Sequence, residues 1–228
     1  MLNFIVDRFL APQRCHWCKA AVRGSVACSN CTASLPWNTR ACRACALPLI
    51  SAQSKVCATC LQGSPPQDSS WTAFRYETPV VQQILSLKFH GHLQSAHILG
   101  ALMAARLAQR AEPLPELLIP VPLHTSRLRL RGYNQAVEIG RELSARLTLS
   151  LRPEFALRKQ ATREQTELSA VERRRNVRGV FTVDSAVAGR HIALLDDVIT
   201  TGATIAELAR MARKAGAARI EAWAVARA

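Results

Sequence analysis

The second two-thirds of the chain alternates short apolar runs with segments whose apolar residues recur at helical spacing. The short runs predict strands over residues 71–76, 117–122, 155–158, 180–183, 191–195 and 220–225. The helical spacing predicts helices over residues 79–89, 93–109, 134–147, 169–177 and 204–214. Ser169 and Glu172 form a capping-box pattern in the fourth of these helices. Such alternation is typical of an α/β domain built on a mainly parallel sheet.

The first twelve residues carry apolar side chains at helical spacing, which predicts a short amphipathic helix. Asp7 and Arg8 stand where a secretory signal needs an uninterrupted apolar segment, so we expect a cytoplasmic protein. The longest apolar run, residues 98–105, is far shorter than the roughly 18 residues that a membrane span needs. We therefore expect no membrane insertion.

Composition indicates a globular chain of two parts. Of the 228 residues, 49% are hydrophobic and 20% are charged, which excludes collagen-like and wholly disordered proteins. Residues 62–68 are rich in Gly, Ser, Pro and Gln, as linkers are, and all eight cysteines precede them. The sequence therefore predicts a cysteine-rich domain over residues 1–66 and an α/β domain over residues 67–228.

The cysteines form four C-x2-C pairs, a spacing typical of zinc ribbons. Each pair sets two thiolates on one face of a tight turn, and a tetrahedral Zn²⁺ takes two pairs at about 2.3 Å per Zn–S bond. Eight ligands therefore predict two zinc sites. A disulfide scaffold would suit a secreted chain, and an iron–sulfur cluster is another use of four cysteines. In chain order, the pairs are Cys15/Cys18, Cys28/Cys31, Cys42/Cys45 and Cys57/Cys60.

The way in which the pairs share the two ions follows from loop length. Sequential use, with the first two pairs on one ion and the last two on the other, closes shorter loops than an interleaved arrangement, so it is favoured. Four thiolates leave no open position for water or substrate, which makes the predicted zinc structural. Some sixty residues bury too little surface to fold alone, so metal removal should unfold this domain.

The formal net charge is +14, from 30 basic and 16 acidic side chains. Arginines dominate the basic clusters of the second half, and their forked guanidinium groups match phosphate oxygens bidentately. The partners this favours are a phosphorylated small molecule or a nucleic-acid backbone, while a solvated surface is the simpler alternative. The clusters comprise Arg127, Arg129, Arg131, Arg152, Arg158, Lys159, Arg163, Arg173, Arg174, Arg175 and Arg178.

The apolar strand over residues 191–195 runs into two acids, a small-residue loop and the start of a helix. Backbone amides of the loop and the positive end of the helix suit a phosphate, and Gly202 permits its close approach. Carboxylates at the carboxyl end of a strand are placed to accept hydrogen bonds from ribose hydroxyls or to approach a bound Mg²⁺. This stretch, which predicts a phosphosugar site, comprises Asp196, Asp197, Val198, Ile199, Thr200, Thr201, Gly202, Ala203 and Thr204.

Other interpretations of this stretch explain less. One alternative is that the acids and threonines only cap a helix and bind no ligand. Capping does not explain why two adjacent carboxylates stand at the end of an apolar strand. The stretch lacks the G-x-x-x-x-G-K-[ST] pattern of a Walker loop and the G-x-G-x-x-G pattern of a dinucleotide site.

Residues 192–204 closely resemble the signature with which type I phosphoribosyltransferases bind 5-phosphoribosyl 1-pyrophosphate (PRPP). The resemblance implies that Asp196 and Asp197 contact the ribose hydroxyls as the catalytic pair, and that residues 200–204 hold the 5′-phosphate. It also implies a pyrophosphate loop over residues 124–131. The residues of that loop and of its flank that would act on pyrophosphate are Arg127, Arg131, Asn134 and Gln135.

Further segments, together with the cysteine-rich N-terminus, resemble hallmark segments of the ComF family. They include Lys88-Phe89-His90-Gly91, Pro120-Val121-Pro122-Leu123-His124, Arg127, Arg131-Gly132-Tyr133-Asn134-Gln135, Thr162, Gln165, Leu168, Arg173, Asn176 and Phe181.

The family resemblance implies a double zinc ribbon fused to a type I phosphoribosyltransferase-like domain, an α/β fold whose parallel sheet is flanked by helices. It implies a cytoplasmic protein that binds PRPP with Mg²⁺ and takes part in DNA uptake during competence for natural transformation. The acceptor of a transferred phosphoribosyl group is unknown, which leaves enzymatic activity open. The alternative is a non-catalytic adaptor that binds single-stranded DNA or DNA-uptake proteins and keeps a vestigial PRPP site.

Overall fold

The structure is a computed structural model that describes residues 13–51, 53–159 and 178–228. It divides into two compact units, Met1–Leu35 and Pro36–Ala228. Several predictions lie outside the described residues: the helices over residues 1–12 and 169–177, the cations Arg163, Arg173, Arg174 and Arg175, and the family residues Thr162, Gln165, Leu168 and Asn176.

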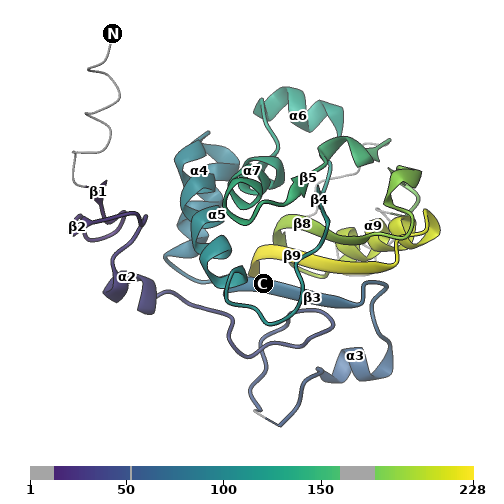
Figure 1. Cartoon of the computed structure of the whole chain (residues 1–228), viewed down its shortest axis with the longest axis horizontal. Helices are drawn as coiled ribbons and strands as arrows, with labels where there is room; N and C mark the ends of the chain where they lie inside the picture. The colour runs from purple at the N-terminus through teal and green to yellow at the C-terminus, as the bar shows by residue number, and fades with distance from the viewer. Residues whose placement is uncertain (1–12, 52, 160–177) are drawn as a thin grey trace. The chain divides into compact units, whose positions relative to one another are not determined.

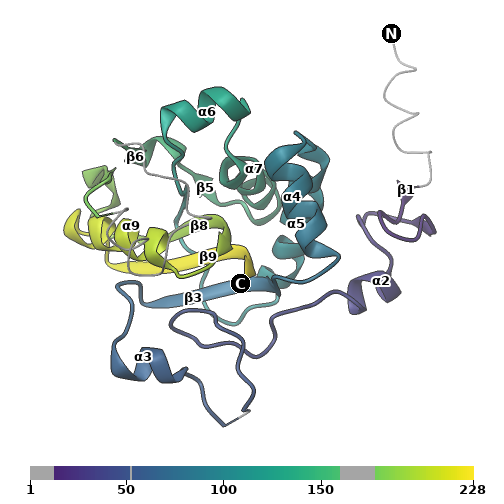
Figure 2. The same ribbon diagram turned by 180° about the vertical axis from the view of Figure 1, so that it is seen from behind.

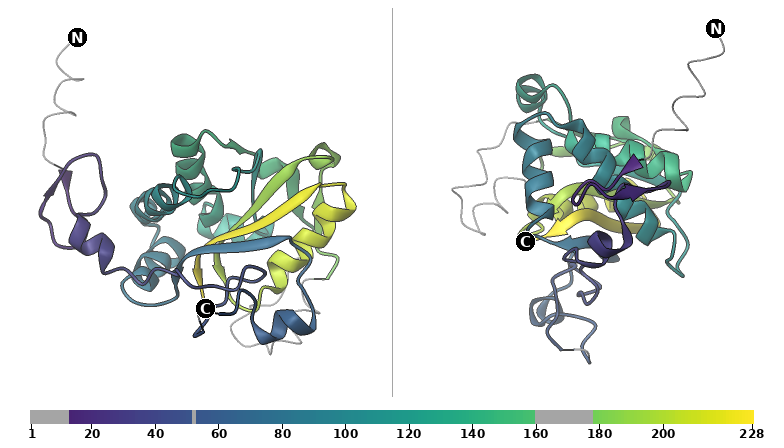
Figure 3. Two further views of the ribbon diagram at one scale, coloured as in Figure 1. Left: turned by 60° about the horizontal axis from the view of Figure 1, so that its bottom comes forward. Right: turned by 90° about the vertical axis from the view of Figure 1, so that its left-hand side faces the viewer.

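The larger unit is built on a five-stranded sheet in which all neighbouring strands are parallel, with the order β3-β9-β8-β4-β5. Figures 1 and 3 show β9 lying between β3 and β8. The predicted α/β class with a parallel sheet flanked by helices is confirmed. The strands are β3 (Ser69–Arg75), β4 (Leu117–Pro120), β5 (Ser150–Leu151), β8 (His191–Ile199) and β9 (Arg219–Arg227).

Helices cover both faces of this sheet. On one face, α7 packs so closely that a Cβ atom on its Gly140 would lie 3.3 Å from Leu195 and 3.7 Å from Leu118. On the other face, α9 joins the core that contains Ile192 and Leu194. Figures 1 and 2 show α4, α5 and α7 together, apart from α9. The helices are α4 (Val80–Phe89), α5 (Leu93–Leu107), α6 (Thr125–Arg131), α7 (Gln135–Leu147) and α9 (Ala203–Lys214).

The connections of β4 and β8, which are neighbours in the sheet, leave in opposite directions. From β4 the chain passes through α7 to β5 at one edge, and from β8 it passes through α9 to β9 on the other side. In an open parallel sheet, such a reversal leaves a crevice at the carboxyl ends of the two strands. The topology therefore leaves a crevice after Pro120 and Ile199.

The remaining elements are short. In the described part of the larger unit there are also an antiparallel hairpin and two 3-10 turns, and brief strands and helices lie among the cysteines. They are β1 (Gln13–Arg14), β2 (Ala21–Val22), α2 (Ser29–Ala33), α3 (Ala58–Gln62), η1 (Pro153–Phe155), β6 (Ala156–Arg158), β7 (Phe181–Val183) and η3 (Ser185–Val187).

The predicted strand over residues 191–195 is too short, because β8 continues to Ile199. The prediction that the acids follow this strand is therefore wrong. Asp196 lies in the ladder with β9, opposite Ala224, whereas β4 ends at Pro120 opposite Leu195. The longer partner strand β9 keeps the acids in extended backbone, and the end of β4 opens their other side.

The division into units falls after Leu35, so the segment with the last four cysteines belongs to the same unit as the sheet. The domain boundary near residue 66 stays a prediction. Among the described helices, none combines the length and the apolar character that crossing a membrane requires.

Candidate functional site

A cavity of about 400 Å³ opens at the carboxyl ends of β4 and β8, a size that suits a small-molecule site. Residues 196–204 line it from β8 and the start of α9, and the segment after β4 lines it from the other strand. The structure thus brings together the nine residues predicted for the phosphosugar site and the four side chains predicted to act on pyrophosphate, whereas the other residues of the loop 124–131 do not line the cavity. Those from the second segment are Arg127, Arg131, Asn134 and Gln135.

The phosphate loop, residues 200–204, turns from β8 into the 12-residue helix α9. Gly202 stands at the N-cap with φ +75°, a left-handed conformation that favours glycine. The first turn of α9 contains no acid, so no side chain of that turn neutralises the positive end of the helix. A helix start with this positive potential is suited to bind an anion such as phosphate.

The two acids of the site are held by their own backbone and by a lysine. Asp196 Oδ1 accepts a hydrogen bond from Asp197 N at 2.9 Å, and Asp197 Oδ1 accepts one from Val198 N at 2.8 Å. Lys88 Nζ lies 3.4 Å from Asp197 Oδ2. Burial, and then the neighbouring Asp197 carboxylate, raise the pKa of Asp196 to about 8. Asp196 is therefore mostly protonated near neutral pH.

Four cations line the cavity beside these two acids: Lys88, Arg127, Arg131 and Arg158. Burial, followed by repulsion from Arg127, lowers the pKa of Arg158. The guanidinium group of Arg131 lies 5.8 Å from the ring centre of Phe89 at the rim. The surplus of positive charge suits a ligand that carries several negative charges.

Asn134 and Gln135, which are both predicted to act on pyrophosphate, differ in their hydrogen bonding. Asn134 caps α7, since its Oδ1 accepts from Ala136 N at 3.0 Å while its Nδ2 donates to the Val121 carbonyl at 2.9 Å. Gln135 is 3% exposed, and its Nε2 has no hydrogen-bond partner in the described part of the chain. A buried donor without a partner costs about 1–3 kcal/mol. On the wall of the cavity, this amide can donate to an oxygen of a ligand.

The structure adds lining residues that the sequence analysis does not place in this site: Tyr76, Leu85, Lys88, Phe89 and Arg158. Lys88 and Phe89 belong to a segment that resembles the ComF family, and Arg158 belongs to a basic cluster. These sequence patterns single out the three residues but do not predict that they lie in the cavity. Their place depends on how α4 and the β6–β7 hairpin pack against the end of the sheet.

The cysteines form two clusters with sequential pairing, as predicted. In each cluster, the four sulfur atoms lie within 4.8 Å of one another. Sulfurs around a tetrahedral zinc ion with Zn–S bonds of about 2.3 Å are about 3.8 Å apart. The Cys18–Cys28 and Cys45–Cys57 sulfur separations, 3.6 and 3.7 Å, fit that geometry. The first cysteine cluster is Cys15, Cys18, Cys28 and Cys31, and the second is Cys42, Cys45, Cys57 and Cys60.

The leading cysteine of each cluster favours the thiolate form. Burial raises the pKa of Cys15, but hydrogen bonds from the backbone of Cys18, Cys28 and Trp17 outweigh it and lower the pKa to about 6. The same balance of burial and backbone hydrogen bonds lowers the pKa of Cys42 to about 7. The thiolate is the metal ligand, so each cluster offers one ligand in its metal-binding form. Other members favour the thiol, since a hydrogen bond with Cys28 raises the pKa of Cys31 to about 12 and burial raises that of Cys60.

Comparison with known proteins agrees with both parts of the chain. A family model described as a double zinc ribbon domain matches residues 6–61. A DNA utilization protein YhgH of Escherichia coli O157:H7 is 35% identical over 204 residues, covering 88% of this chain and 89% of that protein. Competence protein F of Haemophilus influenzae is 31% identical over 221 residues, covering 94% and 90%. The chain belongs to the ComF family. Its two cysteine clusters are the metal sites of the double zinc ribbon.

Solved structures resemble this ComF-family chain more distantly. A glutamine PRPP amidotransferase from B. subtilis has a TM-score of 0.38 and 18% identity, covering 55% of this chain and 26% of that one. A hypoxanthine phosphoribosyltransferase from Trypanosoma cruzi has a TM-score of 0.35 and 20% identity, covering 57% and 62%. Membership of the family therefore rests on the sequence relatives.

Proposed function

We propose that this ComF-family protein binds PRPP with Mg²⁺ in the cavity at the carboxyl ends of β4 and β8, and that it takes part in the cytoplasmic handling of incoming DNA. The observation that carries the first part is one cavity lined by an acid pair, the start of α9 and four cations. The names of the relatives, DNA utilization protein and Competence protein F, support the second part.

The phosphosugar half of the ligand belongs on β8 and α9. Backbone amides of the phosphate loop hold the 5′-phosphate, and the left-handed Gly202 lets it approach the backbone closely. Asp196 and Asp197 accept hydrogen bonds from the ribose hydroxyls. A ribose hydroxyl that donates to Asp196 favours its ionised form, so binding releases a proton near neutral pH.

The pyrophosphate half belongs on the segment that follows β4. Arg127, Arg131 and the Gln135 amide supply donors to its oxygens. Bound Mg²⁺ would neutralise further charge on the pyrophosphate, and as a hard cation it prefers oxygen ligands such as carboxylates.

The same arrangement supports phosphoribosyl transfer when an acceptor nucleophile is present. The bond between C1 of the ribose and pyrophosphate breaks, and the electron pair leaves with pyrophosphate. A bond forms between C1 and the acceptor, which loses its proton. The ribose passes through an oxocarbenium-like state while arginine side chains stabilise the leaving group.

Isothermal calorimetry of the zinc-loaded protein with PRPP and Mg²⁺ tests the binding, and ribose 5-phosphate serves as a second ligand. The Asp196→Asn/Asp197→Asn double variant should lose about 100-fold in affinity or more, because hydrogen bonds to charged groups are worth about 1.5–3 kcal/mol each. Asp184→Asn is the matched control, since Asp184 caps the η3 turn through Ala186 N at 2.8 Å and does not line the cavity. Undiminished binding by the double variant would refute the proposed sugar site.

A second candidate function is a DNA-binding adaptor, favoured by the cations of α6 and by an aromatic ring beside them. Phe89 is 66% exposed, and its ring lies next to Arg131. Exposed aromatic rings and cationic side chains are the usual elements of single-strand binding, through base stacking and phosphate contacts. This function is compatible with a ligand in the cavity.

Fluorescence anisotropy with a labelled oligonucleotide tests the adaptor. The affinity should fall steeply between about 50 and 200 mM salt, because released counterions drive the binding. Phe89→Ala should weaken it through the loss of a stacking platform worth about 1–3 kcal/mol. Failure to retain the oligonucleotide at about 50 mM salt would count against the adaptor and leave PRPP binding unaffected.

A further inference from the structure

The first turn of the second cysteine cluster is anchored to the sheet by its carbonyl oxygens. The Ser70 amide of β3 donates to the Arg43 carbonyl at 2.7 Å, and Ser70 Oγ donates to the Ala44 carbonyl at 2.7 Å. Asn38 Nδ2 donates to the Ala46 carbonyl at 2.8 Å. The turn is therefore held in one position relative to β3.

The remaining carbonyl of that turn is held by the last residue of β9. Arg227 Nε donates to the Cys45 carbonyl at 3.1 Å, while Arg227 Nη1 donates to the Ile199 carbonyl at 3.0 Å. Ile199 is the last residue of β8 and directly precedes the phosphate loop. The Ala228 amide donates to the same Ile199 carbonyl at 3.0 Å. One guanidinium group thus joins a zinc-ligand residue to the entrance of the phosphate loop.

The geometry of arginine suits this bridge. Nε and Nη1 belong to one rigid, planar group, so the positions of the two carbonyls are coupled through it. A lysine at this position would keep the positive charge, but its single ammonium group could not hold the two carbonyls in a fixed geometry. Loss of a metal from the cluster would move the Cys45 carbonyl. That movement would shift or release the Arg227 guanidinium group, which also holds the Ile199 carbonyl.

We propose that Arg227 is a positioning residue that couples metal binding at the second cysteine cluster to the shape of the phosphate loop. The proposal rests on the proposed function for the ligand, a phosphate ester. Coupling between two sites is reciprocal. Metal in the second cluster therefore raises the affinity of the loop for its ligand, and ligand in the loop slows the loss of that metal.

Zinc release to a chromophoric chelator tests the metal side of the coupling in the full chain, without ligand and with PRPP. Cys28→Ser identifies the phase that belongs to the first cluster. Arg227→Gln should release zinc from the second cluster at least threefold faster than the wild type, and Arg227→Lys should behave alike. Arg75→Gln is the control, because Arg75 lies opposite Arg227 in the β3–β9 ladder and pairs with Glu77.

Calorimetry tests the ligand side. PRPP should slow zinc release from the second cluster in the wild type and in Arg75→Gln, and its affinity should fall several-fold in both Arg227 variants. Equal zinc release and equal PRPP affinity in all four proteins would overturn the coupling.

A readout without ligand separates this proposal from the proposed function. The Ala206 amide donates to the Gly202 carbonyl at 2.8 Å, so its hydrogen exchange reports on the loop. Exchange should accelerate at least threefold in Arg227→Gln and in Cys57→Ser. If PRPP fails to bind the wild type, the proposed function falls, and faster exchange still supports the coupling. Unchanged exchange in both variants would overturn it.

Discussion

Lys88 Nζ lies 3.4 Å from Asp197 Oδ2, so a helix outside the stretch 196–204 supplies a counter-ion to its acid pair. Lys88 also favours ionisation of the half-buried Asp196, although its desolvation and the neighbouring Asp197 dominate and keep its pKa high. The ammonium group therefore sets the charge that a polyanionic ligand meets in the cavity.

Replacing this lysine should weaken PRPP binding. In Lys88→Gln the acid pair loses its cation and repels the ligand, so we expect the affinity measured by calorimetry to fall about tenfold, which corresponds to about 1.4 kcal/mol. Lys214→Gln, at the exposed end of α9, makes the same change of charge away from the cavity. Equal losses in the two variants would mean that only net charge matters.

The raised pKa of Asp196 predicts how stability depends on pH. The folded protein holds this pKa at about 8, whereas an Asp in an unfolded chain titrates near 3.8. Between these values the folded state binds more protons, so the contribution of Asp196 to the free energy of unfolding is fully present below about pH 4 and falls as the pH rises through 8. The slope approaches about 1.4 kcal/mol per pH unit for one proton.

Urea unfolding at several pH values from 5 to 9 measures this slope. Asp196→Asn should flatten the profile, because it removes the titrating group and leaves Asp197 and Lys88 facing the same site. Asp184→Asn should keep the wild-type profile. A profile in Asp196→Asn as steep as in the wild type would show that another group causes the dependence.

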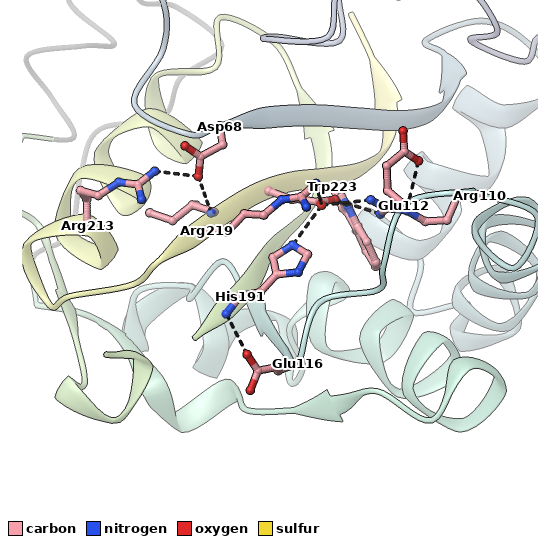
Figure 4. Close-up of polar contacts among 10 residues, drawn as sticks. Asp68, Arg110, Glu112, Glu116, His191, Arg213, Arg219 and Trp223 are labelled. Atoms are coloured by element: carbon pink, nitrogen blue, oxygen red, sulfur yellow. Dashed lines mark hydrogen bonds and ion pairs between the residues drawn. The ribbon is translucent and has the colours of Figure 1, made fainter. Parts of the chain in front are cut away.

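The buried carboxylate of Glu221 gathers donors from two strands, β8 and β9, and from the loop that contains Arg110. Figure 4 labels the four residues that supply them, Arg110, His191, Arg219 and Trp223. Arg110 donates to both of its oxygens at 2.9 and 3.0 Å, and Trp223 Nε1 donates at 2.9 Å. His191 Nε2 and Arg219 Nη2 each lie 3.0 Å from Oε1. Burial raises the pKa of Glu221, but the hydrogen bonds outweigh it and keep the pKa below the ordinary value.

Glu221→Gln should therefore destabilise the fold strongly. It leaves the guanidinium group of Arg110, 15% exposed, without its anion, and breaking a buried ion pair costs about 3–5 kcal/mol. Urea unfolding measures the loss. Glu112→Gln removes an acid that is 64% exposed and lies 3.8 Å from the same Arg110, so it should cost less than about 1 kcal/mol. A similar loss in both variants would contradict the role of burial.

Sequence reasoning locates the features whose residues are close together along the chain. The phosphate loop and the acids before it occupy nine consecutive positions, and each cysteine cluster closes within 19 positions. A local pattern can encode such groups because a turn or a helix start alone brings their atoms together.

Features set by packing between distant elements could not be predicted in this way. Arg158 reaches the cavity from the β6–β7 hairpin and Lys88 reaches it from α4, and neither segment has a spacing that encodes the contact. The position at which β8 ends also depends on contacts with a distant segment of the chain. Two adjacent aspartates argue against a strand over residues 196–199, and pairing with β9 keeps this segment extended.

The two cysteine clusters should differ in what they stabilise, because they lie in different units. The first belongs to Met1–Leu35, and the second belongs to Pro36–Ala228, where its first turn is hydrogen-bonded to β3 and β9. We expect Cys28→Ser and Cys57→Ser each to lower the bound zinc by one ion per chain. Only Cys57→Ser should lower the Tm of the main unfolding transition, by roughly 5–10 °C if the metal site contributes a few kcal/mol.

Calorimetric melting of both variants also decides where the domains divide. The sequence places both clusters in one domain over residues 1–66, which predicts that neither substitution reaches the transition of the sheet. The division of the structure after Leu35 predicts instead that only Cys57→Ser affects this transition. If Cys57→Ser keeps the wild-type main transition while losing its zinc, the hydrogen bonds of the Arg43–Ala46 turn do not carry the stability of the metal site into the sheet. If Cys57→Ser lowers the Tm of the main transition and Cys28→Ser does not, the second cysteine cluster is part of the α/β domain that holds the cavity.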